Sequence, residues 1–505
     1  MSLAIVVFVG ANLVFVLLCS FYNLYLLHQY LRHNGPDPAP LSTFAEADFP
    51  RVTIQLPVYN EGKLAGQILR CAAALDYPHD KLEIQYLDDS DDQETSMIAM
   101  QTIEELALAY PAITFQQLAR TDRKGFKAGA LENGTKHASG EFFAIFDADF
   151  QIPADFLRHL MPYFTDPKVG AVQARWDYTN ADDSLLLRLQ ANKLDVHQMV
   201  DQSGRARAGL TPIFHGTAGI WRKEALMAAG GWDSLSEVED VELTIKAAIL
   251  KWEVRYLDRY RVVSELPETL VGFARQQMRW RRGWSRIALA FSGKVWRADI
   301  PLRQRVDLLL RINLIWGSIG GFIITLGVLP FLSAVSDLGY FWHGAAAYWI
   351  LLAVALVTRY YEDRMLAEYP NPRPPYRLPW FLTYLPLSYI INAMGLMWIL
   401  AQATVEGFRS GQVWEVTPKS GTTIGSEGHA HLTQEKRVPL YVKGTLFLSI
   451  LGIGLMLISL WLWSPIAALF YSLMAIGGGY VGLQLLEIYR PSGVLTRFGK
   501  VFRSV

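Results

Sequence analysis

The chain has 505 residues, of which 51% are hydrophobic, and its formal net charge is zero. This length has room for a soluble domain and several membrane helices, while the balanced charge argues against general binding to nucleic acids. The two cysteines, Cys19 and Cys71, are too few for a disulfide framework or a zinc site.

The first apolar segment runs from Leu3 to Leu27. It is too long for a signal peptide, and it has neither a basic start nor a small-residue cleavage site. It therefore predicts a transmembrane helix within residues 1–35, and Arg32 and His33 favour a cytosolic exit. Residues 36–50 are rich in proline and predict a linker.

An α/β domain is expected over residues 51–270. Short apolar runs bounded by turns predict strands, and helical patterns lie between them. The expected strands are 51–56, 82–87, 113–118, 141–146 and 170–174, and the clearest helical patterns are 92–109 and 154–164. This alternation predicts a mostly parallel sheet with helices on both faces, whose ligands bind beyond the carboxyl ends of the strands.

Candidate binding residues follow the first two strands. The first strand ends in "PVYNE", where Pro57 turns the chain and the Tyr59 ring offers a surface for a nucleobase; an ordinary strand-to-helix turn is the alternative. The second ends in "YLDDSDD", where the adjacent carboxylates of Asp88 and Asp89 repel each other. This repulsion predicts contact with a ligand or cation, whereas the next two acidic residues suit a helix N-terminus.

Two further segments suit a diphosphate. In "DRKGFKAGALENG", Lys124 and Lys127 accompany a glycine-rich helix start, where backbone N–H groups favour phosphate, although the spacing is not that of a P-loop. The fourth strand ends in "AIFDADF", so Asp147 and Asp149 point to the same side. Two carboxylates placed in this way predict a site for Mg²⁺ or Mn²⁺ that also binds a diphosphate.

The next candidates lie in two segments after the predicted strands. The small residues of "FHGTAGIWR" (214–222) suit a close approach of the backbone to a ligand. Farther on, Glu239 and Asp240 begin a predicted helix. Acidic residues at this position are consistent with capping, and they are equally what a general base would look like.

The segment "FARQQMRWRRGW" (273–284) contains four arginines and two tryptophans. So many guanidinium groups suit either lipid headgroups or a phosphate in an active site. The basic residues in and after this segment predict amphipathic helices over 271–311 that lie on anionic lipid. These residues are Arg281, Arg282, Arg286, Lys294, Arg297, Arg303 and Arg305.

Long apolar runs after residue 311 predict further membrane helices. Two are expected within 312–358, at 312–334 and 341–358, and two within 441–488, at 444–464 and 465–486. The run 381–406 is interrupted by polar residues, and both a spanning and an interfacial helix are open. We favour the interfacial helix because it makes 359–440 and the basic tail 489–505 cytosolic.

Seven motifs now stand in a recognisable order: "PVYNE", "LDDS", "KAGAL", "FDADF", "FHGTAG", "VED" and "QQMRW". With them the chain resembles the membrane-embedded family 2 glycosyltransferases, above all the cellulose-synthase-like A and C glucomannan and glucan synthases. The resemblance covers 51–290 and extends to "WEVTPKSG" (414–421). It implies a Rossmann-like α/β catalytic domain of glycosyltransferase A type in the cytosol, joined to an α-helical transmembrane region with interfacial helices.

The resemblance also implies roles for single residues. Asp240, beside Glu239, would be the general base; Asp147 and Asp149 would hold the metal. The nucleotide sugar would contact Pro57, Tyr59, Glu61, Asp88, Asp89, Lys127, Asp147 and Arg279. The acceptor would contact His215, Gly216, Thr217, Gln276 and Trp280, and a gating loop would contain Thr417 and Lys419.

One residue departs from the pattern of the family. The plant relatives usually have Asn where this chain has His215. This position is expected near a bound sugar, so the departure leaves the identity of the sugar open. The tail after residue 488 is too short for the cyclic-dinucleotide receptor domain of bacterial cellulose synthases, which argues against direct control by that nucleotide.

The expected function is that of a processive, inverting hexosyltransferase. It would polymerise a β-linked glucan, mannan or glucomannan from UDP-glucose or GDP-mannose, with Mg²⁺ or Mn²⁺, and pass the polymer across the membrane. A non-processive enzyme that makes a glycolipid is the alternative, and an inactive assembly subunit is a minor one. Expected partners are the growing polysaccharide, membrane lipids and a possible accessory or export subunit, but no nucleic acid. The expected location is the plasma (inner) membrane of a bacterium or the Golgi membrane of a eukaryote.

Overall fold

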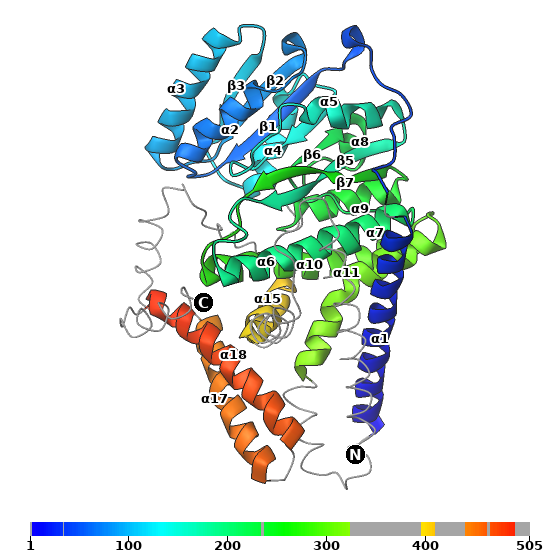
Figure 1. Ribbon diagram of the computed structural model, residues 1–505, viewed down its shortest axis with the longest axis vertical. Helices are drawn as coiled ribbons and strands as arrows, with labels where there is room; N and C mark the ends of the chain where they lie inside the picture. The colour runs from blue at the N-terminus through cyan, green and yellow to red at the C-terminus, as the bar shows by residue number, and fades with distance from the viewer. Residues whose placement is uncertain are drawn as a thin grey trace.

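The computed structural model describes residues 3–33, 35–233, 237–323, 395–409, 440–461 and 465–489. A mixed α/β domain forms one end of the molecule, and α1 (Leu3–Arg32) and the C-terminal helices extend away from it (Figure 1). Between these two parts lie α6 (Leu185–Val196) and α10 (Leu270–Arg297), which run across the underside of the domain (Figure 1).

A seven-stranded sheet is the centre of the α/β domain, with the order β3-β2-β1-β4-β6-β5-β7. The strands are β1 (Val52–Val58), β2 (Leu82–Asp88), β3 (Thr114–Ala119), β4 (Phe142–Ile145), β5 (Val169–Tyr178), β6 (Gly219–Arg222) and β7 (Glu253–Ser264). All neighbours pair in parallel except β6, which is antiparallel to both β4 and β5. The five predicted strands and the mostly parallel sheet are thus confirmed.

Two strands were not predicted from the sequence. Strand β6 has only four residues, and β7 (Glu253–Ser264) carries charged residues along much of its length. Both lack the apolar run that identifies a buried strand. Strand β7 lies at an edge of the sheet, where charged side chains reach solvent and are tolerated.

Helices cover both faces of the sheet, as the alternating pattern predicts. One core cluster joins β1, β2 and β4 to α2 (Lys63–Ala73), α3 (Gln93–Ala109) and α5 (Phe156–Leu160). A second cluster, on the opposite face, joins Phe143 and Ile145 to α4 (Phe126–His137), α8 (Lys223–Ala228) and α9 (Glu239–Ile249). Successive residues of β4 therefore serve opposite cores, because side chains alternate along a strand. The helical pattern 154–164 forms as α5 followed by a 3₁₀ helix (Met161–Thr165).

The remaining described helices form two groups. Helix α10 contacts α11 (Leu302–Ile323), α15 (Met397–Gly407) and α18 (Pro465–Tyr489), and the last two contact α17 (Leu440–Trp461). The π-helix η4 (His197–Ser203) and α7 (Gly204–Arg207) contact each other and α1. Apolar residues of α10, α15, α17 and α18 share one core cluster. Helix α11 continues without a break through residue 312, where the sequence predicts the boundary between the interface helices and the first of the later membrane helices.

Within the described ranges, no helix combines the length and the apolarity that a crossing of a membrane requires. The predicted span 341–358 lies outside these ranges, as do residues 324–334, 381–394 and 490–505.

Arg282 of α10 does not face lipid as predicted. Its side chain is 4% exposed; Nε lies 3.0 Å from a carboxylate oxygen of Glu237, and Nη1 lies 3.4 Å from one of Glu406 on α15. Arg286 also approaches Glu237, at 3.9 Å. We expected every arginine on the helix to lie at the surface, whereas Arg282 and Arg286 form ion pairs with carboxylates of neighbouring segments. Lys294, Arg297 and Arg303 are exposed.

We expect Arg282→Ala to lower the free energy of unfolding by about 3 kcal/mol or more, because it leaves the buried Glu237 carboxylate without its closest cation. Arg297→Ala, at an exposed position of the same helix, is the matched control and should change it by no more than about 0.5 kcal/mol. Denaturant titration of both variants measures the difference. Equal values would contradict the structural role of Arg282.

Candidate active site

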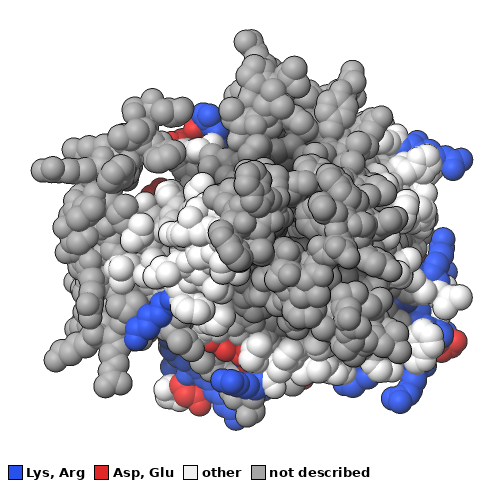
Figure 2. Space-filling model, turned by 90° about the horizontal axis from the view of Figure 1, so that it is seen from below, with Lys and Arg blue, Asp and Glu red and all other residues white. Residues whose placement is uncertain are grey.

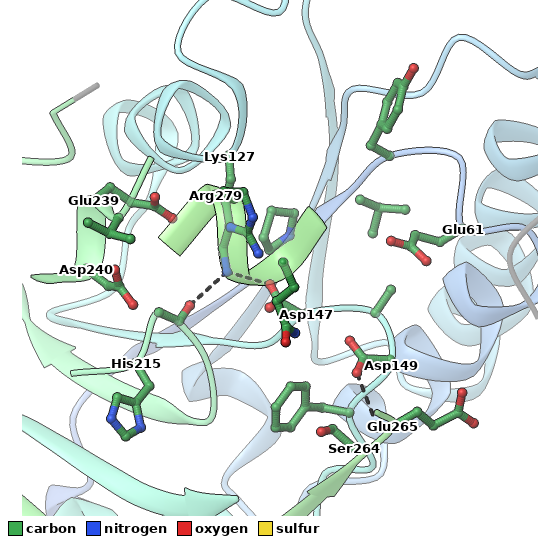
Figure 3. Close-up of a pocket in the computed structure, with 18 of the residues that line it drawn as sticks. Glu61, Lys127, Asp147, Asp149, His215, Glu239, Asp240, Ser264, Glu265 and Arg279 are labelled. Atoms are coloured by element: carbon green, nitrogen blue, oxygen red, sulfur yellow. Dashed lines mark hydrogen bonds and ion pairs between the residues drawn. The ribbon is translucent and has the colours of Figure 1, made fainter. Parts of the chain in front are cut away.

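A cavity opens at the carboxyl ends of β1 and β4, at the edge of the sheet where ligands were expected (Figure 3). The segment before β6, the start of α9 and the first half of α10 complete its walls. It brings together most of the predicted site residues. These are Pro57, Tyr59, Glu61, Asp89, Lys127, Asp147, Asp149, His215, Gly216, Glu239, Asp240, Gln276, Arg279 and Trp280.

Lys127 of α4 is the central cation of the cavity. Its Nζ lies 2.5 Å from a carboxylate oxygen of Asp147 and donates a hydrogen bond of 3.0 Å to the carbonyl oxygen of Gly216. The ammonium group also attracts the carboxylates of Glu239 and Asp240, on the side away from Asp149 (Figure 3). One cation thus connects the end of β4, the segment before β6 and the start of α9.

The two predicted metal ligands lie along the same wall. Asp149 is buried, and one of its carboxylate oxygens accepts a hydrogen bond of 3.4 Å from the backbone N–H of Glu265. Asp147 and Asp149 both present carboxylates to the cavity, which is the donor chemistry that Mg²⁺ or Mn²⁺ prefers. No cluster of three acidic, histidine or cysteine ligands forms in the described ranges. A cation here would therefore need further ligands from a bound diphosphate and from water.

Thr217 supports this wall from behind rather than lining the cavity. Its side chain is buried, and its Oγ1 accepts a hydrogen bond of 2.9 Å from the backbone N–H of Asp147. Thr217 therefore holds the backbone that carries Asp147, and the structure does not support direct contact with an acceptor.

Asp88 is likewise absent from the cavity wall. Its carboxylate accepts hydrogen bonds from Ser90 N–H (3.0 Å), Ser96 Oγ (2.7 Å) and Gln117 Nε2 (3.2 Å). The repulsion that predicted a ligand is relieved within the chain, because Arg120 forms an ion pair with the neighbouring Asp89. The Asp88 carboxylate is thus satisfied within the chain, and its expected contact with a nucleotide stays a prediction, while Asp89 itself lines the cavity.

Arg123 is a cavity residue that sequence reasoning missed. Its guanidinium group lies 3.3 Å from the centre of the Tyr59 ring, and the Tyr59 hydroxyl donates a hydrogen bond of 3.1 Å to Asp91. The tyrosine predicted to receive a nucleobase is thus fixed by a cation on one face and a carboxylate at its tip. In the sequence, Arg123 stood beside Lys124 and Lys127, and only the two lysines were singled out as candidates for phosphate contact. Lys124 is in fact exposed.

Glu239 and Asp240 form an acidic pair at the start of α9. Burial and the neighbouring Glu239 carboxylate raise the pKa of Asp240 to about 7, against the weaker opposing influence of Lys127 and Arg279. Burial also raises the pKa of Glu239. A carboxyl group that titrates near neutral pH can accept and release a proton in a reaction. The sequence allowed either helix capping or a general base at this position, and the buried acidic pair supports the general base.

Gly216 allows the Asp240 carboxylate to lie close to the backbone before β6. Its φ is +77°, and a Cβ added there would lie 3.0 Å from Oδ2 of Asp240. A larger residue would be strained in this backbone conformation and would push against the carboxylate. The small residue predicted to favour close approach thus makes room for the candidate base.

Three residues of the arginine-rich segment on α10 also line the cavity. Gln276, Arg279 and Trp280 are three and four positions apart on α10, which places them on one face of the helix. Trp176, Glu237 and Glu265 also line the cavity but were missed, because none stood in a motif. The proposed gating residues Thr417 and Lys419 lie outside the described residues.

Known proteins resemble this chain mainly over the catalytic domain. Residues 50–283 match the model of a family described as glycosyltransferase like family 2. The chain is 41% identical over 253 residues to glucomannan 4-beta-mannosyltransferase 1 of Oryza sativa subsp. japonica, covering 49% of this chain and 48% of the relative. It is 40% identical over 241 residues to glucomannan 4-beta-mannosyltransferase 2 of Arabidopsis thaliana, covering 47% and 45%. The chain thus spans about half the length of the curated relatives that it matches.

A solved structure extends the likeness to the fold. The mannosyltransferase PcManGT from Pyrobaculum calidifontis, in complex with GDP-Man and Mn²⁺, superposes with a TM-score of 0.53 at 22% identity. The match covers 81% of this chain and 98% of the other. The mixed, mostly parallel sheet with helices on both faces is therefore of the expected glycosyltransferase A type.

We expect the Asp240 carboxyl group to titrate with an apparent pKa of about 7. Glu239→Gln should lower this value, because it removes a negative charge that disfavours ionisation of Asp240. Infrared difference spectra of the carboxyl band over a pH series, with Asp240→Asn to identify the signal, measure both values. A wild-type titration near the ordinary aspartate value of 3.8 would contradict this view of the pair.

Proposed function

We propose that residues 50–283, which match the model of glycosyltransferase like family 2, form the catalytic domain of an inverting hexosyltransferase that polymerises a β-linked glycan from a nucleotide-diphospho sugar. One observation carries the proposal: Asp240, with a pKa of about 7, shares a cavity with Lys127 and Arg279, two cations suited to a diphosphate. A base and a cationic leaving-group site in one cavity are what a displacement at a glycosyl carbon requires.

The transfer follows from this geometry. Asp240 takes the proton of an acceptor hydroxyl group while that oxygen forms a bond to the anomeric carbon of the donor sugar. The bond from the anomeric carbon to the phosphate oxygen breaks, and the nucleoside diphosphate leaves with the bonding electrons. Lys127 and Arg279 stabilise the negative charge that develops on the leaving group. A divalent cation held by Asp147 and Asp149 would supply further charge neutralisation there.

GDP-mannose is the donor that we favour, with Mn²⁺ as the cation. The relatives from rice and Arabidopsis are named as glucomannan mannosyltransferases, and the archaeal structure holds GDP-Man and Mn²⁺. UDP-glucose, alone or together with GDP-mannose, is the second candidate, because a glucomannan contains both sugars. The proposed product is therefore a mannan or a glucomannan.

The residues of α10 that line the cavity favour polymerisation over the synthesis of a glycolipid. Gln276 and Trp280 lie on the same face of α10 as Arg279, so an acceptor sugar can stack on the indole ring beside the donor. A glycolipid remains the alternative product. An inactive assembly subunit is disfavoured because the cavity contains both the acidic pair and the two candidate metal ligands.

We further propose that the helical end of the molecule sits in a membrane, with the catalytic domain at its cytosolic face. Large apolar side chains on α1 and α17 are exposed, among them Phe21, Phe447 and Ile450. Lys and Arg side chains stand around the edge of the face from which these helices project (Figure 2). Apolar side chains surrounded by basic ones favour contact with anionic lipid. A growing polymer leaving this cavity would then cross the bilayer through the helical end.

We expect the purified protein in lipid to convert GDP-mannose, with or without UDP-glucose, into a polymer that a β-1,4-mannanase digests. Asp240→Asn should lower the rate by about 10²- to 10⁴-fold, the usual contribution of a general base, and leave donor binding intact. The wild-type rate should rise with pH through about 7, because Asp240 is active only after losing its proton. A lipid-linked product would support the alternative, and full activity of Asp240→Asn would remove Asp240 as base.

Replacing both Asp147 and Asp149 by Asn should weaken Mn²⁺-dependent binding of GDP-mannose by at least tenfold, because two charged oxygen ligands are lost. Isothermal titration with and without Mn²⁺ measures this effect. Asp155→Asn is the matched control, since this carboxylate pairs with Tyr260 outside the cavity. An unchanged dependence on Mn²⁺ in the double variant would contradict the assignment of the metal ligands.

A further inference from the structure

His215 enters the cavity with one ring nitrogen occupied and the other without a partner. The ring lies among Trp176, His197 and Tyr256, with centroid distances of 5.1, 5.3 and 6.4 Å. Its Nε2 contacts Nε2 of Gln202. Its Nδ1 is buried and has no hydrogen-bond partner among the described residues. A buried ring nitrogen is costly to leave unpaired, and a ligand bound in the cavity can supply the partner that the described residues do not.

The orientation of the Gln202 amide is determined by three other contacts. Its Oε1 accepts hydrogen bonds from the backbone N–H of Ile213 (3.1 Å) and from Nη1 of Arg311 (3.3 Å). Its Nε2 donates to the carbonyl oxygen of Ile213 (2.8 Å). Exchanging the amide oxygen and nitrogen would set donors against donors in two of these contacts and acceptor against acceptor in the third. The group facing His215 is therefore an N–H donor.

This donor decides which nitrogen of His215 carries the proton. Since Gln202 offers an N–H group, Nε2 of His215 must accept, and the proton of the neutral ring must be on Nδ1. Burial, together with the nearby His197 and Arg311, holds the pKa of His215 well below its ordinary value, so the ring stays neutral. The nitrogen left without a partner is then a hydrogen-bond donor.

We propose that Gln202 is a positioning residue that fixes His215 as the Nδ1–H tautomer, so that this N–H donates a hydrogen bond to a hydroxyl oxygen of a bound sugar. The sugar part of the proposal rests on the proposed function. Gln202 itself lies behind His215 and is fully buried, so its action on the sugar passes through the imidazole ring.

The helical end of the molecule holds Gln202 in place. Arg311 of α11 contacts Gln202 and also lies 3.2 Å from a carboxylate oxygen of Asp201. Asp201 pairs in turn with Arg205, whose Nε lies 2.8 Å from Asp307 of α11. The tautomer of a cavity residue is thus coupled to the docking of α11 against η4 and α7.

The tautomer can be measured directly in ¹⁵N-histidine-labelled protein without substrate, using His215→Asn to identify the His215 signals. We expect the wild-type ring to be protonated on Nδ1. Gln202→Glu places an acceptor opposite Nε2 and should move the proton to Nε2 or produce the doubly protonated ring. A wild-type ring protonated on Nε2, or an unchanged tautomer in Gln202→Glu, would overturn the proposal.

Gln198→Glu is the matched control for this measurement. Gln198 lies one helical turn earlier in η4, and its Oε1 accepts from the backbone N–H of Trp176 (2.7 Å) and the hydroxyl of Tyr256 (3.0 Å). Its Nε2 donates to the hydroxyl of Tyr178, which can rotate to donate instead. The same substitution therefore fits there, and it should leave the tautomer of His215 unchanged.

Transfer assays with GDP-mannose and UDP-glucose then test the sugar contact. His215→Leu and Gln202→Glu should lower kcat/KM about 3- to 10-fold, the range for one neutral hydrogen bond. His215→Asn should stay within about twofold of wild type, because an amide can accept from Gln202 and donate to a hydroxyl group. Equal losses in His215→Asn and His215→Leu would overturn the sugar contact. An inactive wild type with the expected tautomer would instead refute the proposed function alone.

Discussion

The ion pair between Lys127 and Asp147 is the contact on which the cavity depends. It joins the first turn of α4 to the end of β4, and the hydrogen bond from Lys127 to the Gly216 carbonyl adds the segment before β6. That segment also contains Thr217, which supports the backbone of Asp147, and His215, which lines the cavity. Because β6 runs antiparallel between β4 and β5, residues 215–217 reach the carboxyl end of β4. One reversed strand thus places a second set of polar groups beside Asp147.

Buried charge, as well as apolar packing, fastens the catalytic domain to the helices. Asp307 of α11 pairs with Arg205, and Tyr22 of α1 donates a hydrogen bond to the same carboxylate. On the other side of the cavity, Arg282 joins Glu237 to Glu406 of α15. Buried ion pairs contribute little net stability but are costly to break. They therefore favour one docking geometry of the helices against the domain, and this geometry also holds α10, which forms part of the cavity wall.

The sequence predicted the chemistry of the strand ends better than it predicted the partners of single residues. Asp147 and Asp149 lie in the cavity because a parallel sheet collects the ends of its strands at one edge. The contacts that satisfy the Asp88 carboxylate could not be foreseen, because Ser96 and Gln117 belong to α3 and β3 and become its neighbours only in the fold. Arg282 was misjudged as a surface charge for the same reason.

Periodicity also failed where local patterns carry little information. Strand β6 has four residues, and β7 is rich in charge, so neither has the apolar run of a buried strand. Gln202 could not have been chosen from the sequence, since its importance comes from four contacts with residues 11 to 109 positions away. Polar networks of this kind depend on tertiary geometry, which composition and spacing do not encode.

The proton affinity of Asp240 is linked to the occupancy of the donor site. Lys127 and Arg279 both lower the pKa of Asp240, against the larger influence of burial and of Glu239. A diphosphate bound between these two cations would compensate their charge and so weaken their pull on the Asp240 proton equilibrium. The carboxylate would then hold a proton more tightly, and its ionised fraction at neutral pH would fall. The two cations thus act on the proton equilibrium of Asp240 as well as on the diphosphate site that we propose, so the pH dependence of the reaction should change when the donor binds.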